Sequence, residues 1–196
     1  MIILPENPAP NGAVPTLLDF GFLQRPSTGA AALRVDRPGS RWRLQFSYPV
    51  MQADVARPYI SRLTAAKTEG LRIAFPLQGV SQGSPGSPVV DGSGAAGTSL
   101  PVRGLTPGYV AKEGYWLTII DGDGVYYLHN VRATVAADSS GEATLSIYPM
   151  LRAPVADGDV ILLAKPMVEG VIEGDVSWNM ELANLISGLT FVLEET

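Results

Sequence analysis

Apolar and polar residues alternate most clearly in residues 41–48. The apolar set, which a strand would turn toward a core, is Trp42, Leu44, Phe46 and Tyr48. The polar set, on the opposite face, is Arg41, Arg43, Gln45 and Ser47. A two-residue period is the pattern of a half-buried β-strand. We therefore expect a strand here with a basic outer face.

Residues 51–69 show the only helical pattern in the chain. Asp54 is a candidate N-cap, so the helix is expected over about 54–69, and Gly70 is suited to end it. Pro58 is tolerable because it lies near the start. The residues predicted to form the packing face, spaced at i, i+4, i+8 and i+11, are Val55, Tyr59, Leu63 and Ala66.

The other strand patterns fall into three groups. "VPTLLDFGFL" predicts a first strand, followed by a loop at "RPSTGAAA", and "LRIAFPL" predicts a strand after the helix. Five short strand-like runs separated by glycine-containing turns follow "GSPGSPVVDGSGAAGTSL", as in a small antiparallel barrel or sandwich. The C-terminal residues contain two longer alternating runs that resemble residues 41–48 more than the middle strands.

This arrangement predicts a mainly β fold with one helix (α+β), in which a discontinuous β-sandwich-like domain carries an inserted barrel or sandwich. Residues 1–76 and 169–196 would form the first domain, residues 77–97 a Gly/Ser/Pro-rich connector, and residues 98–168 the inserted domain. Chain ends that lie close in space make such insertions inexpensive.

Charge is divided along the chain. Residues 20–75 contain nine Arg or Lys against three acids, and residues 76–196 contain five against fourteen, within a net charge of −5. Segments of opposite sign can bind nucleic acid or join copies of a chain. The aromatic residues beside Arg34, Arg37, Arg41 and Arg43 should face the core, which makes them poor platforms for stacking bases. A subunit contact is therefore favoured over nucleic acid.

Catalytic and metal-binding patterns are scarce. With no cysteine and His129 as the only histidine, a transition-metal site is improbable, and His129 is expected to be a satisfied or surface residue. "DGDG" at 121–124 fits a hairpin turn better than a calcium loop, because Val125 and Tyr126 occupy the positions of a ligand and a glycine. Acid pairs such as Asp157/Asp159 occur at turns. We expect no enzyme, no cofactor and no metal.

No targeting or membrane segment is expected. "MIILPENPAP" lacks a basic leader region, and the longest aliphatic run, residues 160–164, is too short to cross a bilayer. These features predict a soluble protein made in the cytoplasm, without membrane insertion.

Several segments together resemble the distal-tail or tail-hub proteins of long-tailed bacteriophages. They are "RPYISRLTAAKTEGLRIAF", the stretch from "TSLPVRGLTPGYV" through "GEATLSIYPMLRAPVADGDVILLAKPMVEG", and the closing "VSWNMELANLISGLTFVLEET". The likeness covers about 150 of the 196 residues and rests on patterns rather than on chemical groups.

The resemblance implies a structural virion protein, made in the host cytoplasm, that forms a ring, usually a hexamer, between the tail tube and the tip. Its partners would be copies of itself and other tail proteins, with DNA passing through the lumen without sequence-specific contacts. The residues expected at subunit contacts are Arg37, Arg41 and Arg43 against Glu173, Asp175 and Glu181.

Two alternatives remain open. The inserted domain could be a carbohydrate-binding module for the host surface, with Tyr109, Tyr115, Trp116 and Tyr126 as possible glycan contacts. The chain could instead be a tail terminator, a head–tail connector or a capsid decoration protein.

Overall fold

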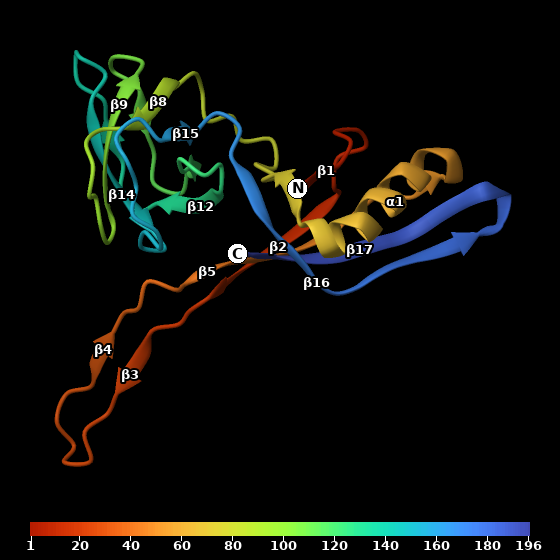
Figure 1. Cartoon of the computed structure of the whole chain (residues 1–196), viewed down its shortest axis with the longest axis horizontal. Coiled ribbons are helices and arrows are strands. Elements are labelled where there is room, and N and C mark those ends of the chain that lie inside the picture. Colours follow the sequence, from red (N-terminus) through yellow and green to blue (C-terminus); the bar gives the residue numbers. More distant parts are fainter.

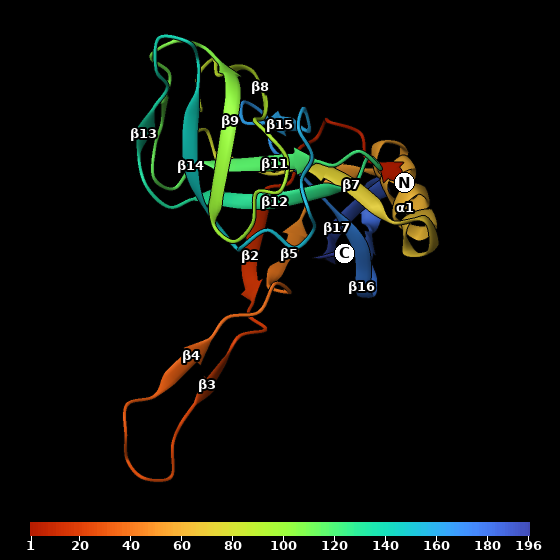
Figure 2. The ribbon, with the colours of Figure 1, turned by 60° about the vertical axis from the view of Figure 1, so that its left-hand side comes forward.

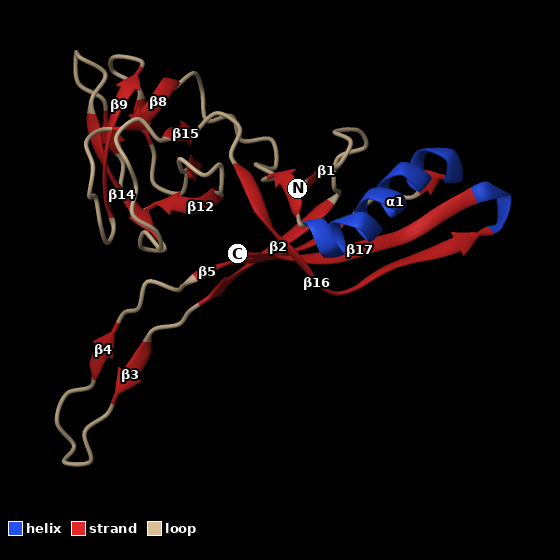
Figure 3. Ribbon diagram, in the orientation of Figure 1, coloured by secondary structure: helices blue, strands red, loops and turns tan.

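The computed structural model describes residues 1–196 and has a mainly β fold with a single α-helix, which confirms the predicted fold class (Figures 1 and 3). Two bodies of β-structure and one projecting hairpin are visible. The first body is a seven-stranded sheet with strand order β1-β7-β16-β17-β5-β2, with β6 paired to β17. The second is a closed six-stranded barrel.

Both ends of the chain contribute strands to the sheet. Its strands are β1 (Ile2–Ile3), β2 (Gly12–Leu18), β5 (Arg41–Ser47), β6 (Met51–Gln52), β7 (Leu71–Ala74), β16 (Met167–Glu181) and β17 (Leu185–Glu195), with the 3-10 turn η1 (Leu182–Asn184) between the last two. Only β1 pairs in parallel, with β7. Because β16 and β17 lie between β7 and β5, the C-terminal hairpin forms the centre of an otherwise N-terminal sheet.

The predicted strand at residues 41–48 is confirmed as β5. Leu44, Phe46 and Tyr48 are buried, and Phe46 stacks on Phe191 of β17 with ring centroids 5.3 Å apart. At the end of the hairpin nearest β7, β16 and β17 approach so closely that a Cβ on Gly170 would lie 1.9 Å from the carbonyl oxygen of Glu194. Only glycine fits there.

Helix α1 (Ala53–Glu69) covers one face of the sheet (Figure 1). Its N-cap is Gln52, whereas Asp54 lies in the first turn and accepts a hydrogen bond from the amide of Val55, so the predicted cap was wrong. The buried face is Ala56, Tyr59, Leu63 and Ala66. Val55 was predicted to pack on the sheet but is 40% exposed, because Ala56 takes its place on the buried face in the first turn of the helix.

The middle of the chain closes into an antiparallel barrel in the order β11-β12-β14-β9-β8-β15. Its strands are β8 (Gly86–Val90), β9 (Ser99–Leu105), β11 (Trp116–Ile120), β12 (Tyr126–Val131), β14 (Ala143–Tyr148) and β15 (Val160–Leu162), and a small ladder joins β10 (Val110–Ala111) to β13 (Val135–Ala136). The "DGDG" hairpin is confirmed between β11 and β12.

The connector expected at residues 77–97 is not a free linker, because it supplies strand β8 to the barrel. Gln82 in the same segment is also buried, and its side-chain amide nitrogen donates to the carbonyl oxygen of Trp116 at 2.7 Å. The amide oxygen of Gln82 accepts from the Trp116 backbone at 2.7 Å. A sequence rich in Gly, Ser and Pro therefore forms ordered structure here.

A long hairpin, which we call the arm (residues 19–40), projects away from both bodies (Figures 1 and 2). Its strands are β3 (Phe22–Gln24) and β4 (Leu33–Val35), which pair only with each other. The single strand expected across "VPTLLDFGFL" is broken at Asp19, whose side chain accepts the amide of Gly21 at 2.9 Å. The loop expected at "RPSTGAAA" is the end of this arm.

Candidate subunit interface

Two of the predicted contact arginines, Arg41 and Arg43, lie on β5 and form ion pairs within the chain. Arg41 Nη2 is 2.6 Å from Glu194 Oε1, and Arg43 Nη2 is 2.8 Å from Glu173 Oε2 on β16. The structure thus brings together one predicted pair, Arg43 and Glu173, inside one copy. Both ion pairs join the basic N-terminal part of the chain to its acidic C-terminal part.

The basic N-terminal part and the acidic C-terminal part of the chain therefore form ion pairs with each other inside one subunit. Arg72 of β7 and Glu169 of β16 form a third ion pair of this kind, 2.5 Å apart, and the Glu169 side chain is only 5% exposed. Since the sheet interleaves N-terminal and C-terminal strands, segments of opposite sign become neighbours. Sequence reasoning assigned this charge to contacts between copies because it could not see the strand order.

The other predicted contact residues lie on projecting parts of the molecule. The Arg37 guanidinium carbon lies 4.8 Å from the ring centroid of Phe22 in the arm. Asp175 and Glu181 are exposed on the outer part of β16, where Glu181 accepts a hydrogen bond from Ser187 Oγ at 2.7 Å. Arg37 belongs to the arm and the two acids belong to β16, and the arm and the outer end of the β16–β17 hairpin extend away from each other (Figure 1), so the structure does not bring these residues together in one copy.

The four possible glycan contacts are half-buried. Trp116 packs edge-on against Trp42 with centroids 4.9 Å apart, and it lies 4.3 Å from the Phe75 ring. Arg72 covers Tyr126, with its guanidinium carbon 3.6 Å from the ring centroid. These side chains hold the barrel against the sheet.

The other two possible glycan contacts, Tyr109 and Tyr115, pack against the core of the barrel. The hydroxyl of Tyr109 donates to the backbone oxygen of Gln82 at 2.6 Å, and burial raises the pKa of Tyr109 to about 12. Tyr115 lines a hollow of about 350 Å³ with Trp116 and Phe75. A role for these residues in binding sugar stays a prediction.

A buried carboxylate that sequence reasoning missed, Glu195, joins the barrel to the sheet. Its side chain accepts the backbone amides of Trp42 at 2.9 Å and Leu128 at 2.7 Å. Arg152 Nη2 lies 2.8 Å from Glu195 Oε1 in an ion pair between side chains that are 10% and 0% exposed. Burial raises the pKa of Glu195, an effect that Arg152 partly opposes.

His129 lies beside this junction on β12 and is buried. Its Nδ1 is 2.8 Å from the carbonyl oxygen of Pro149, so Nδ1 carries the proton of the neutral ring. Nε2 has no hydrogen-bond partner. Burial, with a smaller contribution from Arg152, lowers the pKa of His129 to about 4. The expectation of a satisfied or surface histidine was therefore wrong at this nitrogen.

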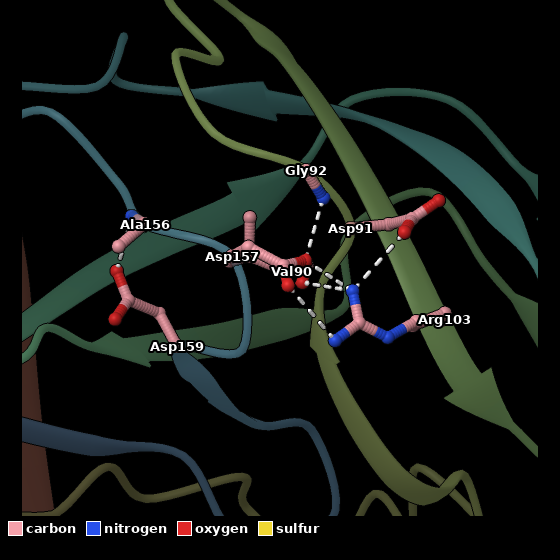
Figure 4. Close-up of polar contacts among 7 residues, drawn as sticks. All are labelled: Val90, Asp91, Gly92, Arg103, Ala156, Asp157 and Asp159. Atoms are coloured by element: carbon pink, nitrogen blue, oxygen red, sulfur yellow. Dashed lines mark hydrogen bonds and ion pairs between the residues drawn. The ribbon is translucent and has the colours of Figure 1, made fainter.

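A polar cluster closes the barrel where β8, β9 and the turn before β15 meet (Figure 4). Arg103 forms ion pairs with Asp157 and with Asp91, the latter at 3.1 Å. Asp157 also accepts the amide of Gly92 at 2.8 Å, and hydrogen bonding from Arg103 lowers its pKa. Asp159 instead accepts the amide of Ala156 at 2.7 Å. The Asp157/Asp159 pair thus fastens a turn.

The "DGDG" turn shows the same use of carboxylates. Asp121 Oδ1 accepts the amides of Asp123 at 3.0 Å and Val125 at 2.9 Å, which fixes the chain reversal. No group of three or more His, Cys, Asp or Glu side chains in residues 1–196 is arranged to hold a metal ion. The one α-helix lacks the length and apolar content to cross a membrane.

Exposed apolar side chains gather on two projections that sequence reasoning did not single out. In the arm they are Phe20, Phe22, Leu23 and Leu33, which are 47%, 43%, 48% and 61% exposed. At the outer end of the β16–β17 hairpin, which we call the tip (residues 175–187), Met180 and Leu182 are 80% and 93% exposed. The signal that could have found the arm is the "FGFL" at 20–23 facing the "LRV" at 33–35 across a Gly-containing turn.

No family model matches this sequence, and no curated protein matches it.

Proposed function

We propose that this chain is a structural protein of a bacteriophage tail, a distal-tail component whose copies form a ring that joins the tail tube to the tip. The proposal of a tail protein comes from the resemblance of the sequence to distal-tail and tail-hub proteins. The proposal that copies assemble into a ring is supported by one observation: two projections, the arm and the tip, extend from opposite ends of one sheet (Figure 1).

Each projection has large apolar side chains that are exposed by 43% to 93%. Contiguous exposed apolar surface on a folded domain marks sites of interaction with other molecules. A subunit with contact surfaces at two opposite ends can bind a copy at each end, and such head-to-tail contacts close into a ring when the rotation between copies permits. The barrel would face neighbouring tail proteins.

Electron microscopy of the purified protein in negative stain tests this proposal. We expect closed rings of about six copies. A single monomeric species of 20.7 kDa at every concentration studied would contradict ring formation. Trimers would favour a decoration protein instead, and binding of host glycans by the intact protein would favour the carbohydrate-binding alternative.

A further inference from the structure

The arm lacks the support that a two-stranded hairpin needs. Register places Phe22 opposite Val35 and Gln24 opposite Leu33, so these four side chains share one face. Phe22 and Leu33 on that face are 43% and 61% exposed. An isolated two-stranded hairpin is at best marginally stable in water, and it gains independent stability from a third strand or a packed helix. The arm face therefore requires a partner.

A groove suited to this face lies at the tip. It has a volume of about 450 Å³ and runs between the start of α1 and the outer part of the β16–β17 hairpin. Its apolar lining is Ala53, Ile60, Trp178, Met180, Leu185 and Ile186. We call it the tip groove.

The arm of a chain cannot reach its own tip groove. The arm leaves the sheet where Leu18 pairs with Arg41, whereas the groove lies where Leu185 pairs with Gln52 at the other end of the sheet. The two projections extend in opposite directions (Figure 1). An arm seated in a tip groove must therefore come from another molecule.

The unpaired charges of the arm are positive, and those of the β16–β17 hairpin at the tip are negative. In the arm, Arg34 is bound by Asp19 and Asp36, but Arg25 and Arg37 are in none of the ion pairs of the chain. At the tip, Asp175 and Glu181 are likewise in none of them, and neither is Arg57 of α1, which lines the tip groove together with Glu181. Complementary charges of this kind steer association and set its register.

We infer that the arm of one copy packs its Phe22–Leu33 face into the tip groove of a second copy, with Arg25 and Arg37 on the side of Glu181, the acid that lines the groove. The inference rests on the proposed ring and names the contact that would build it. The contact is head-to-tail, because each copy offers an arm to one neighbour and a groove to the other.

Two variants of the full chain test the contact, each measured by mass photometry and by light scattering after size exclusion. The arm variant carries Phe22→Thr and Leu33→Thr, which keep strand propensity while removing apolar area. The tip variant carries Met180→Thr and Glu181→Lys. We expect each variant alone to stay monomeric, because loss of a central apolar anchor weakens such a contact by about thirtyfold or more.

An equimolar mixture of the two variants gives the sharper result. The arm variant keeps a native groove and the tip variant keeps a native arm, so together they can form one contact but no ring. We expect dimers in the mixture and monomers in either solution alone. The control is Val160→Thr, which changes a side chain that is 46% exposed on the barrel and should leave assembly unchanged. Circular dichroism checks that every variant is folded.

The outcomes separate the two proposals. If the wild-type chain forms rings and either variant also forms them, the arm–groove contact is wrong while the ring stands. If the tip variant assembles and the arm variant does not, the contact joins arm to arm, or arm to another surface, and the inference is overturned. If the folded wild-type chain is monomeric at all concentrations, the ring fails and the contact with it.

Discussion

The barrel and the arm are both antiparallel β-structure made from short strands, yet they differ in what they leave exposed. In the barrel every strand has two neighbours, and fifteen buried apolar residues fill a core of its own. In the arm β3 and β4 have only each other, and four large apolar side chains are exposed. Closing a sheet removes its edges and hides its apolar face, whereas an open hairpin keeps both available.

The difference separates folding from assembly. Residues of the barrel and of its junction with the sheet should determine the stability of one copy. Residues of the arm should affect stability little and association strongly. Matched substitutions in the two regions therefore test this division.

The largest effect on stability is expected at the junction. Arg152→Met would leave the carboxylate of Glu195 buried without its ionic partner, and removal of one member of a buried ion pair costs about 3–5 kcal/mol. The free energy of unfolding in urea measures this loss. Arg132→Met changes an exposed arginine of the same barrel and serves as the matched control. Equal stability of the two variants would show that the junction pair does not hold the barrel in place.

The next prediction compares the same substitution, leucine to alanine, in the barrel and in the arm. Leu145→Ala removes a fully buried side chain of β14 and should lower the free energy of unfolding by about 2–5 kcal/mol. Leu33→Ala removes an arm side chain that is 61% exposed, and the same measurement on monomeric protein should change by less than about 0.5 kcal/mol. Similar losses at the two positions would contradict the division.

Much of the fold could be predicted from periodicity, because alternation reports which face of an element is buried. The strand at 41–48 and the helix ending at Gly70 are examples. Periodicity does not report what covers a face. It therefore missed that Trp116 packs against the sheet and that β8 belongs to the barrel, since proline and glycine within residues 83–97 suggest a linker.

The candidate interface was harder to predict for the same reason. Arg43 and Glu173 were predicted to meet across a contact between copies, whereas the strand order brings them together within one copy. The alternation of β17 places Glu195 on the same face as Phe191 and Leu193, but a charged residue at the end of this run does not reveal its partners. They are residues 42, 128 and 152, far away in the sequence.

A pH-dependent effect should arise from His129 in the barrel. The folded protein keeps this ring neutral down to a pKa of about 4, whereas the unfolded chain binds a proton near 6.5. The unfolded state therefore takes up the proton first, and the free energy of unfolding should fall by roughly 3 kcal/mol as the pH drops from 6.5 to 4. Glu195 acts in the opposite sense, because burial raises its pKa.

His129→Gln isolates the histidine contribution. The amide can still donate to the carbonyl oxygen of Pro149, but it does not titrate. We expect a smaller loss of stability between pH 6.5 and 4 than in the wild-type chain, measured by urea unfolding at a series of pH values. An unchanged slope would exclude His129 as its source.

Hydrogen–deuterium exchange, followed as the protein concentration is raised through the range in which copies associate, compares the two regions in one sample. We expect the amides of Phe22–Gln24 and Leu33–Val35 in the arm to become protected as assembly proceeds, while the amides of Trp116–Ile120 in the barrel are protected equally at all concentrations. Association without any added protection in the arm would show that copies do not join through the arm.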